Sequence, residues 1–285
     1  MNSAIEAARQ SYAEELRSLA HMSSQALFAA FAKVPRERFV GPGPWRILGR
    51  DGDWTTENED PRHVYHNVLI ALDEAKGVNN GQPSLWALFL DQLGVRAGDH
   101  LLHLGCGTGY YTAILAEVVG PQGRITAIEI DKAIAERARI ALAPWPLVNV
   151  LHGDGSRGPF EPADIIVVSA GATHPPPSWL AALKPGGKLL FPLTPDWGTG
   201  AMALLTRKSE EAFEAQLMFG VQFIPFSGAH DPNVSARLSS ALHRDRGTAV
   251  RSLRCDPHDK EDTCWLHGEG WCFSTRDPVQ ADPVA

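Results

Sequence analysis

The chain has 285 residues, of which 44% are hydrophobic and 21% are charged, as is typical of a globular protein that buries a large core. A formal net charge of −7 leaves no basic excess to neutralise phosphates, so we expect no nucleic-acid partner. The apolar runs are too short for a membrane span, and four cysteines are too few for a disulfide scaffold. No secretory signal is evident either, so we expect a cytoplasmic protein.

The N-terminal part of the chain combines helices with an irregular stretch. Apolar residues recur at helical spacing over 4–33, and Ser23-Ser24 divides this range into two predicted helices. Residues 41–63 are rich in glycine, proline and charge, which predicts a long irregular segment anchored by two tryptophans. An apolar strand is predicted from Tyr65 to Leu72.

The next stretch predicts a helix and then a glycine-rich turn between a strand and a second helix. An apolar helix is expected from Pro83 to Leu93, with proline in the first turn, where its missing N–H is not needed. The apolar run 101–104 precedes Gly105-Cys106-Gly107-Thr108-Gly109, and an apolar helix follows from 110. Glycine allows a sharp turn that approaches a ligand closely, and the following helix N-terminus favours an anion.

The remaining elements alternate between strand and helix. Strands are predicted at 123–129, 148–155, 164–168, 188–192, 201–206 and 217–226, and helices at 132–142 and 178–183. This alternation predicts an α/β fold with a doubly wound, mostly parallel sheet and helices on both faces. We expect an N-terminal helical and irregular segment at 1–76, a core at 77–232, and a C-terminal β-rich extension of a helix and a β-hairpin at 233–285.

The spacing of the turns separates two kinds of nucleotide site. The dinucleotide pattern G-x-G-x-x-G requires glycine at position 110, where this chain has Tyr110, so nicotinamide-dependent oxidoreduction is disfavoured. The strand at 123–129 ends in Glu129, at about the 20-residue distance where a ribose diol is bound in such folds. Asp154 and Gly155 end the next strand. With these three turns, the chain resembles the S-adenosylmethionine-dependent methyltransferases.

Further motifs narrow the resemblance to the protein-L-isoaspartate O-methyltransferases. In chain order they are Val34-Pro35-Arg36-Glu37-Arg38-Phe39-Val40, Gly77 to Leu93, His152-Gly153-Asp154-Gly155, Leu183 to Pro192, and Phe223-Ile224-Pro225-Phe226. The resemblance implies a Rossmann-like methyltransferase core that binds S-adenosyl-L-methionine and methylates a carboxylate of a protein or peptide. A carboxylate is already ionised at neutral pH, so this reaction needs no general base.

The resemblance also implies which residues form the site. Asn80, Gly81 and Ser84, at the start of the helix from Pro83, are the candidate catalytic residues. The candidate cofactor-binding residues are Asn79, His103, Gly105, Gly107, Gly109, Tyr110, Glu129, Ile130, Asp154, Gly155 and Ser227. The glycines would border the amino-acid end of the cofactor, Glu129 would accept from both ribose hydroxyls, and Asp154 with Gly155 would hold the adenine edge.

The chain departs from the family at Asn79-Asn80-Gly81, where the family has Thr-Ile-Ser and the serine contacts the acceptor carboxylate. Gly81 removes a hydroxyl donor worth about 1–3 kcal/mol in a buried site. The backbone N–H groups of Gly81 and Ser84, or the side chains of Asn79, Asn80 and Ser84, are alternative donors. Two further possibilities therefore stay open. One is a divergent enzyme for a dedicated peptide or small-molecule acid, and the other is a non-catalytic S-adenosylmethionine-binding protein.

Two Cys-x-x-His pairs near the C-terminus are compatible with either a metal site or a plain hairpin. Cys255 and His258 form one pair, Cys264 and His267 form the other, and Cys272 lies close in sequence. In a regular strand, Cys264 and His267 would point to opposite faces because their separation is odd. We therefore predict a β-hairpin made by 249–254 and 263–275, and no metal site. The sequence sets no oligomeric state.

Overall fold

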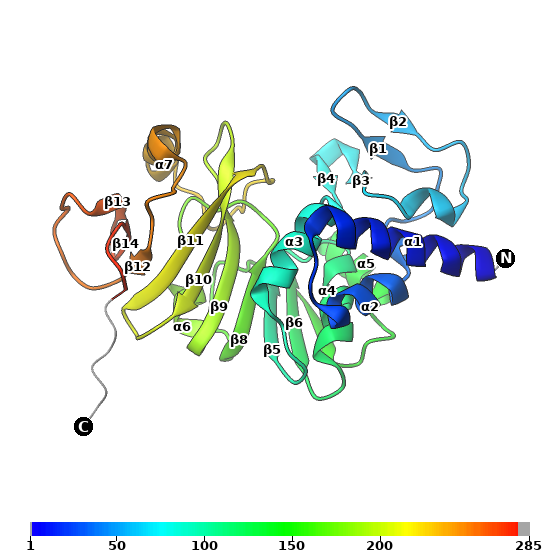
Figure 1. The fold of residues 1–285 in the computed structure, drawn as a ribbon, viewed down its shortest axis with the longest axis horizontal. Coiled ribbons are helices and arrows are strands. Elements are labelled where there is room, and N and C mark those ends of the chain that lie inside the picture. The colour runs from blue at the N-terminus through cyan, green and yellow to red at the C-terminus, as the bar shows by residue number, and fades with distance from the viewer. Residues whose placement is uncertain (1, 279–285) are drawn as a thin grey trace. The chain divides into compact units, whose positions relative to one another are not determined.

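The computed structural model describes residues 2–278, so residues 279–285 of the predicted C-terminal extension lie outside the described part. The chain forms two compact units (Figure 1). Of the described residues, the first unit contains 2–99 and 106–153, and the second contains 100–105 and 154–278. Within the described residues, every helix is too short or too polar to cross a membrane.

The first unit contains the predicted N-terminal helices. Its α-helices are α1 (Asn2–Ala20), α2 (Gln25–Lys33), α3 (Pro83–Leu93), α4 (Tyr110–Val119) and α5 (Lys132–Ala141). The predicted break before α2 is confirmed, because Ser24 caps α2 by accepting a hydrogen bond from the Leu27 N–H. The predicted bounds of α3 are also confirmed, with Pro83 in its first turn.

The strands of the first unit form two groups. The first group is β1 (Arg46–Leu48), β2 (Trp54–Thr55), β3 (Leu69–Asp73) and β4 (Val78–Asn79), with the order β2-β1-β3-β4. The second group is β6 (Arg124–Glu129) and β7 (Val148–His152), which pair in parallel. Three 3-10 turns connect these elements: η1 (Arg36–Arg38), η2 (Pro61–Val64) and η3 (Glu74–Lys76).

The prediction that residues 41–63 are irregular is correct for most of the range but misses a short hairpin. β1 and β2 form an antiparallel hairpin in this range. Beside it, the Trp45 N–H donates to Thr56 Oγ1 at 2.9 Å and the Thr56 N–H donates to the Trp45 carbonyl at 3.0 Å. Trp45 is buried as predicted for an anchor, whereas Trp54 is 49% exposed and is not a buried anchor. Strands of three and two residues are too short to show the period-of-two pattern that predicts a strand.

A buried arginine organises the segment that follows the hairpin. The fully buried Arg36 guanidinium donates to the carbonyl oxygens of Val64, His66 and Val68 at 2.6, 2.8 and 2.7 Å. These carbonyls bind a side chain and are not available to a neighbouring strand. The strand predicted to begin at residue 65 therefore begins only at Leu69.

Arg36→Lys is expected to lower the free energy of unfolding by about 2 kcal/mol, because one ammonium cannot replace a forked guanidinium on three carbonyls. Urea unfolding measures this difference. Arg38→Lys is the matched control, since Arg38 is exposed in the same 3-10 turn. Equal stability of the two variants would contradict the anchoring role of Arg36.

The second unit is built on a sheet with the strand order β13-β14-β12-β11-β10-β9-β8-β5. Its strands are β5 (His100–Leu104), β8 (Ala163–Val168), β9 (Leu183–Leu193), β10 (Gly200–Arg207), β11 (Ala212–Val221), β12 (Ser252–Arg254), β13 (Cys264–Gly268) and β14 (Trp271–Ser274). Its α-helices are α6 (Pro177–Ala182) and α7 (Pro232–Asp245). β5, β8 and β9 are parallel, and the pairings from β9 to β13 are antiparallel. The predicted α/β class and β-rich extension are confirmed, with a mixed sheet.

Two strand predictions near the C-terminus need correction. The strand predicted at 217–226 spans Ala212–Val221, because the backbone of Ile224 and Phe226 pairs with Gly171 instead. The predicted hairpin of 249–254 with 263–275 is also different. The hairpin is β13 with β14, and β12 pairs with β14 on its other edge. The left-handed Gly270, with φ of +73°, makes the turn that divides the range 263–275.

Candidate functional site

In the first unit, the glycine turn is tied to the carboxylate of Glu129. The Gly107 N–H donates to Glu129 Oε2 at 2.9 Å, and the Asp131 N–H donates to Oε1 at 3.0 Å. The Glu129 side chain is buried at the end of β6. Each carboxylate oxygen keeps a further lone pair, so two backbone bonds orient a group that can still accept two hydroxyls. A ribose diol fits this arrangement.

The turn itself requires glycine at its last position. Gly109 caps α4 with φ of +93°, a left-handed conformation that other residues rarely adopt. A Cβ at Gly109 would lie 2.6 Å from Leu142 Cδ1, which is too close for any side chain. Position 109 therefore requires glycine for two reasons: its backbone is left-handed, and Leu142, the residue directly after α5, packs against it.

Tyr110 and Ile130, two predicted cofactor-binding residues, differ in their surroundings. The Tyr110 hydroxyl donates to the Tyr12 hydroxyl at 3.3 Å, and the ring packs against the rings of Phe31 and Phe39. The Tyr110 side chain thus belongs to an aromatic core, and only its backbone at the start of α4 is suited to a ligand. Ile130 is 48% exposed directly after Glu129, where its side chain can pack on a planar ligand.

The backbone donors expected at the start of α3 are already used. The Gly81 N–H donates to Asn79 Oδ1 at 2.9 Å, and the Ser84 N–H donates to Asn67 Oδ1 at 2.9 Å. The expectation that these N–H groups receive an acceptor carboxylate is therefore wrong, because side-chain carbonyls cap them. Sequence reasoning missed Asn67, since no local signal links it to a helix 17 residues later.

Asn80 presents a buried donor without a partner. Its Oδ1 accepts from the Ile70 N–H at 2.8 Å, and its N–H donates to the Ile70 carbonyl at 3.0 Å. The first bond fixes the orientation of the amide, so the nitrogen and oxygen positions are not interchangeable. Nδ2 is buried and finds no partner among the described residues. Such a donor costs about 1–3 kcal/mol unless a ligand accepts from it.

Gly81 lies against two aromatic side chains. Its φ is +71°, and a Cβ there would lie 2.4 Å from Trp86 Nε1 and 2.9 Å from Trp86 Cδ1. The Tyr111 hydroxyl donates to the Gly81 carbonyl at 3.0 Å, and the Trp86 and Tyr111 ring centroids are 5.0 Å apart. Trp86 therefore fills the space that a serine side chain would need at this position.

In the second unit, the Asp154 turn is held by hydrogen bonds from Ser156. Asp154 Oδ1 accepts from the Ser156 N–H at 2.9 Å and from Ser156 Oγ at 2.7 Å. Burial opposes ionisation of Asp154, but the Ser156 hydrogen bonds and the nearby Arg157 outweigh it and lower the pKa of the carboxyl group. Asp154 is therefore an ionised acceptor at neutral pH.

The turn after Phe226 packs on the Asp154 turn. A Cβ at Gly155 would lie 3.1 Å from Phe226 Cζ, and a Cβ at Gly228 would lie 2.6 Å from Asp154 Oδ1. Ser227, between these two contacts, is exposed. The structure therefore brings Asp154, Gly155 and Ser227 together within the second unit.

His103 and Gly105 complete the predicted residues of the second unit. His103 is fully buried on β5, and its Nε2 lies 2.8 Å from Ser169 Oγ. Burial lowers the pKa of His103 to about 4, so the imidazole is neutral at neutral pH. Gly105 follows β5 with φ of +68°, as a sharp turn out of the sheet requires.

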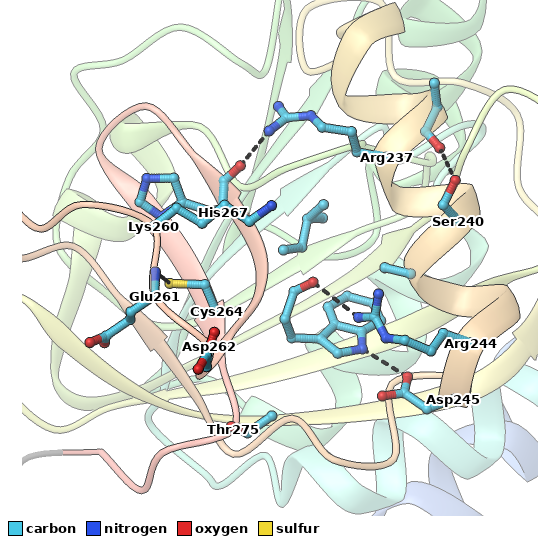
Figure 2. Close-up of a pocket in the computed structure, with 14 residues that line it drawn as sticks. Arg237, Ser240, Arg244, Asp245, Lys260, Glu261, Asp262, Cys264, His267 and Thr275 are labelled. Carbon is cyan, nitrogen blue, oxygen red and sulfur yellow. Dashed lines mark hydrogen bonds between the residues drawn. The ribbon is translucent and has the colours of Figure 1, made fainter.

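A separate pocket of about 630 Å³ lies beside α7 in the second unit (Figure 2). Arg237 and Arg244 of α7 form one wall, and Lys260, Glu261 and Asp262 contribute to the other. The predicted site residues do not line this pocket.

Known proteins resemble this chain over most of its length. The sequence profile of the family described as protein-L-isoaspartate(D-aspartate) O-methyltransferase (PCMT) matches residues 53–231. Protein-L-isoaspartate O-methyltransferase 1 of Rhodopseudomonas palustris is 34% identical over 206 residues, which cover 71% of this chain and 76% of that protein. Protein-L-isoaspartate O-methyltransferase of Methanothermobacter thermautotrophicus is 30% identical over 227 residues, which cover 78% and 96%.

Solved structures share the fold. A protein-L-isoaspartate O-methyltransferase superposes with a TM-score of 0.65 and 26% identity, over 85% of this chain and 70% of that chain. A putative protein-L-isoaspartate O-methyltransferase from Plasmodium falciparum, in complex with S-adenosyl-L-homocysteine, has a TM-score of 0.63 and 18% identity, over 77% and 98%. These two likenesses confirm the predicted Rossmann-like methyltransferase fold.

Proposed function

The chain belongs to the protein-L-isoaspartate(D-aspartate) O-methyltransferase family, and we propose that it methylates a carboxylate of a protein or peptide. Its cofactor is S-adenosyl-L-methionine, which supplies an electrophilic methyl group when bound. The main structural support is the Glu129 carboxylate, which can bind the ribose of the cofactor. Two backbone N–H groups orient this carboxylate, and it keeps lone pairs for the two ribose hydroxyls.

The proposed cofactor residues follow the family motifs and the local geometry of each unit. Gly105, Gly107 and Gly109 give a close backbone approach for the amino-acid end, and Glu129 accepts from the ribose. The residues that complete the proposed set are Asn79, His103, Tyr110 through its backbone, Ile130, Asp154, Gly155 and Ser227.

The chain's own residues can position the acceptor without a base. An acceptor carboxylate is ionised at neutral pH, so its oxygen could take the methyl group of S-adenosylmethionine without losing a proton, and S-adenosylhomocysteine would be the leaving group. We assign the buried Asn80 Nδ2 as the donor that holds one carboxylate oxygen and leaves the other free to attack. The Ser84 hydroxyl, in the first turn of α3, is a second candidate contact.

The acceptor is where this chain differs from its family. With Trp86 in the space of the family's serine, a dedicated peptide or small-molecule acid is a second candidate acceptor beside isoaspartyl residues. We infer a cytoplasmic location, which the low cysteine count of four in 285 residues supports. Protein or peptide partners, rather than nucleic acids, agree with the net charge of −7.

An isoaspartyl peptide compared with its aspartyl twin tests the acceptor directly. We expect turnover of the isoaspartyl peptide alone. If neither peptide is methylated while S-adenosylhomocysteine still binds, isoaspartyl residues are not the acceptor and a dedicated acid takes their place. If no acid of either class is methylated, the protein binds the cofactor without catalysis and the proposed activity fails.

Asn80→Asp is expected to raise the KM for the acceptor about 10-fold or more, because the variant keeps the oxygen that binds the Ile70 N–H but replaces a donor by a negative charge. Steady-state kinetics with the best acceptor measures this change, and S-adenosylhomocysteine affinity should stay the same. Asn149→Asp, on the exposed side of β7, is the control for the added charge. Equal KM values for both variants would remove Asn80 from the acceptor site.

A further inference from the structure

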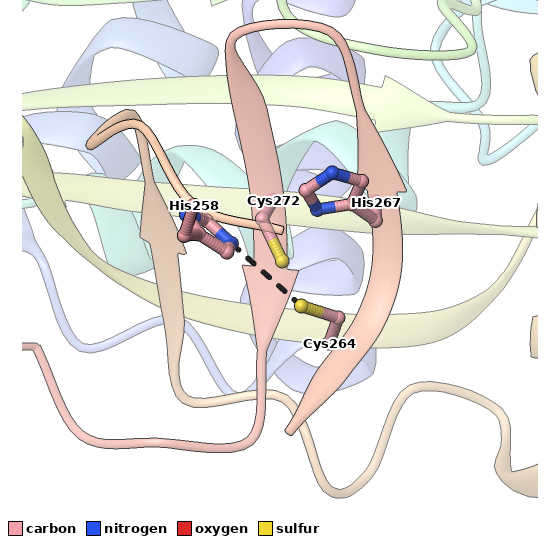
Figure 3. Close-up of side chains that lie close together, drawn as sticks. All are labelled: His258, Cys264, His267 and Cys272. Carbon is pink, nitrogen blue, oxygen red and sulfur yellow. Dashed lines mark hydrogen bonds between the residues drawn. The ribbon is translucent and has the colours of Figure 1, made fainter. Parts of the chain in front are cut away.

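Four metal-ligating side chains converge in the second unit. His258 lies in the loop before β13, Cys264 and His267 lie on β13, and Cys272 lies on β14, and all four point toward one another (Figure 3). Their potential ligand atoms all lie within 4.8 Å of one another. We propose that these four side chains, here named the Cys2His2 cluster, form a structural zinc site.

A β-bulge explains why the sequence predicted otherwise. The register of β13 against β14 shifts between Cys264 and Leu266, because β13 contains one extra residue there. The bulge reverses the alternation of side chains, so Cys264 and His267 share a face despite their odd separation. His267 is also directly opposite Cys272, and opposed residues in a pair of strands place their side chains on one face. The expectation of opposite faces is therefore wrong.

Hydrogen bonds prepare His258 and Cys264 to act as ligands. His258 Nδ1 lies 2.8 Å from the Asp256 carbonyl oxygen, which can only accept, so Nδ1 carries the proton and Nε2 keeps its lone pair. Nε2 lies 3.7 Å from Cys264 Sγ. The Glu261 N–H points at the same sulfur at 3.4 Å, which favours a thiolate. Metal-bound histidines are usually oriented by such a second hydrogen bond.

His267 adds an unsatisfied nitrogen. Its Nδ1 is buried and has no hydrogen-bond partner among residues 2–278. A buried polar atom of this kind destabilises the fold unless a ligand satisfies it. Two thiolates and two neutral imidazoles balance the charge of Zn²⁺ and complete a tetrahedral shell without an open position. The site is therefore structural and not catalytic.

The zinc site would fix the edge of the C-terminal extension. Arg254 pairs with Asp256 and Glu261, and so already holds the loop that carries His258. Arg237 Nη1 of α7 donates to the His267 carbonyl at 2.6 Å, which ties β13 to the helix. Cys264 and His267 also line the pocket beside α7 (Figure 2). Zinc would link the loop that carries His258 to the β13–β14 hairpin, which also forms part of the pocket wall. Structural metals stabilise small protein domains with a small hydrophobic core in the same way.

Metal analysis of the full-length chain, expressed with zinc in the medium and purified without chelator, tests the proposal. We expect about one zinc per chain, and at least a tenfold loss of zinc in Cys264→Ser and Cys272→Ser. Cys255→Ser is the matched control, because Cys255 lies near the loop but outside the Cys2His2 cluster, and it should keep its zinc. Melting curves with S-adenosylhomocysteine show whether each variant is folded.

Cobalt binding to the reduced, metal-free wild-type chain gives a second readout that needs no variant. A thiolate-to-cobalt absorption band that zinc abolishes would support the site. A wild-type chain that contains no zinc and gives no such band overturns the proposal. Equal zinc loss in Cys255→Ser and Cys264→Ser would also overturn it, as would a Cys264–Cys272 disulfide found by mass spectrometry in freshly purified protein.

Discussion

Glu129→Ala is expected to weaken S-adenosylhomocysteine binding about 100-fold, as measured by isothermal titration calorimetry. The variant lacks the carboxylate that we propose accepts two charge-assisted hydrogen bonds from the ribose, together worth about 3 kcal/mol. The Gly107 and Asp131 N–H groups lose their acceptor as well, so the glycine turn is no longer held in its binding conformation. Both effects act on affinity in the same direction.

Glu136→Ala is the matched control for the loss of a carboxylate. Glu136 lies on α5 at an exposed position, where its one ion pair within the described residues is with Arg139 on the same helix. This variant should bind S-adenosylhomocysteine like the wild type. If Glu129→Ala also binds like the wild type, Glu129 does not hold the ribose. Stabilisation of the wild type by NAD and not by S-adenosylhomocysteine would refute the cofactor assignment itself.

Gly81→Ser is expected to lower the free energy of unfolding by about 2–5 kcal/mol and to give no increase in the turnover of isoaspartyl peptides. Restoring the family's residue places a Cβ 2.4 Å from Trp86 Nε1, and overpacking of this kind costs about 1–3 kcal/mol. The left-handed φ of +71° costs about a further 1–2 kcal/mol for any residue other than glycine. Urea unfolding and peptide turnover are the two measurements.

Gly77→Ser separates these two costs. Gly77 has almost the same φ, +66°, but a Cβ there meets nothing within 4 Å. This variant should lose only about 1–2 kcal/mol. Similar losses in both variants would show that Trp86 does not fill the serine space. A stable Gly81→Ser variant with increased isoaspartyl turnover would also show that Trp86 does not fill the serine space. The missing serine hydroxyl alone would then explain any difference in acceptor between this chain and its family.

Local signals in the sequence predicted much of the fold. Proline at the start of α3 and the glycine after its end marked both bounds of the helix, and Ser24 marked the start of α2. Three turn-and-strand patterns also predicted which residues bind the cofactor, and that part stays a prediction. These features depend on residues within a few positions of one another, which is the range over which sequence patterns are informative.

Features that depend on distant contacts could not be predicted. Asn67 caps α3 from 17 residues away, and Trp86 closes the space at Gly81 although it follows the apolar pattern of a core residue. The bulge in β13 reverses a side-chain alternation that a regular strand would keep. In each case the backbone course, and not the residue type, decides which groups meet.

Methyl transfer to a carboxylate gives a product with a distinctive reactivity, because alkali cleaves a methyl ester but leaves N-methyl and ether groups intact. The direct test incubates the wild-type chain with methyl-labelled S-adenosylmethionine and an isoaspartyl peptide. We predict label in the peptide that alkali releases as methanol and that Glu129→Ala fails to introduce. Label that resists alkali, or a chain that binds S-adenosylhomocysteine yet labels no peptide or small-molecule acid, would contradict carboxyl methylation.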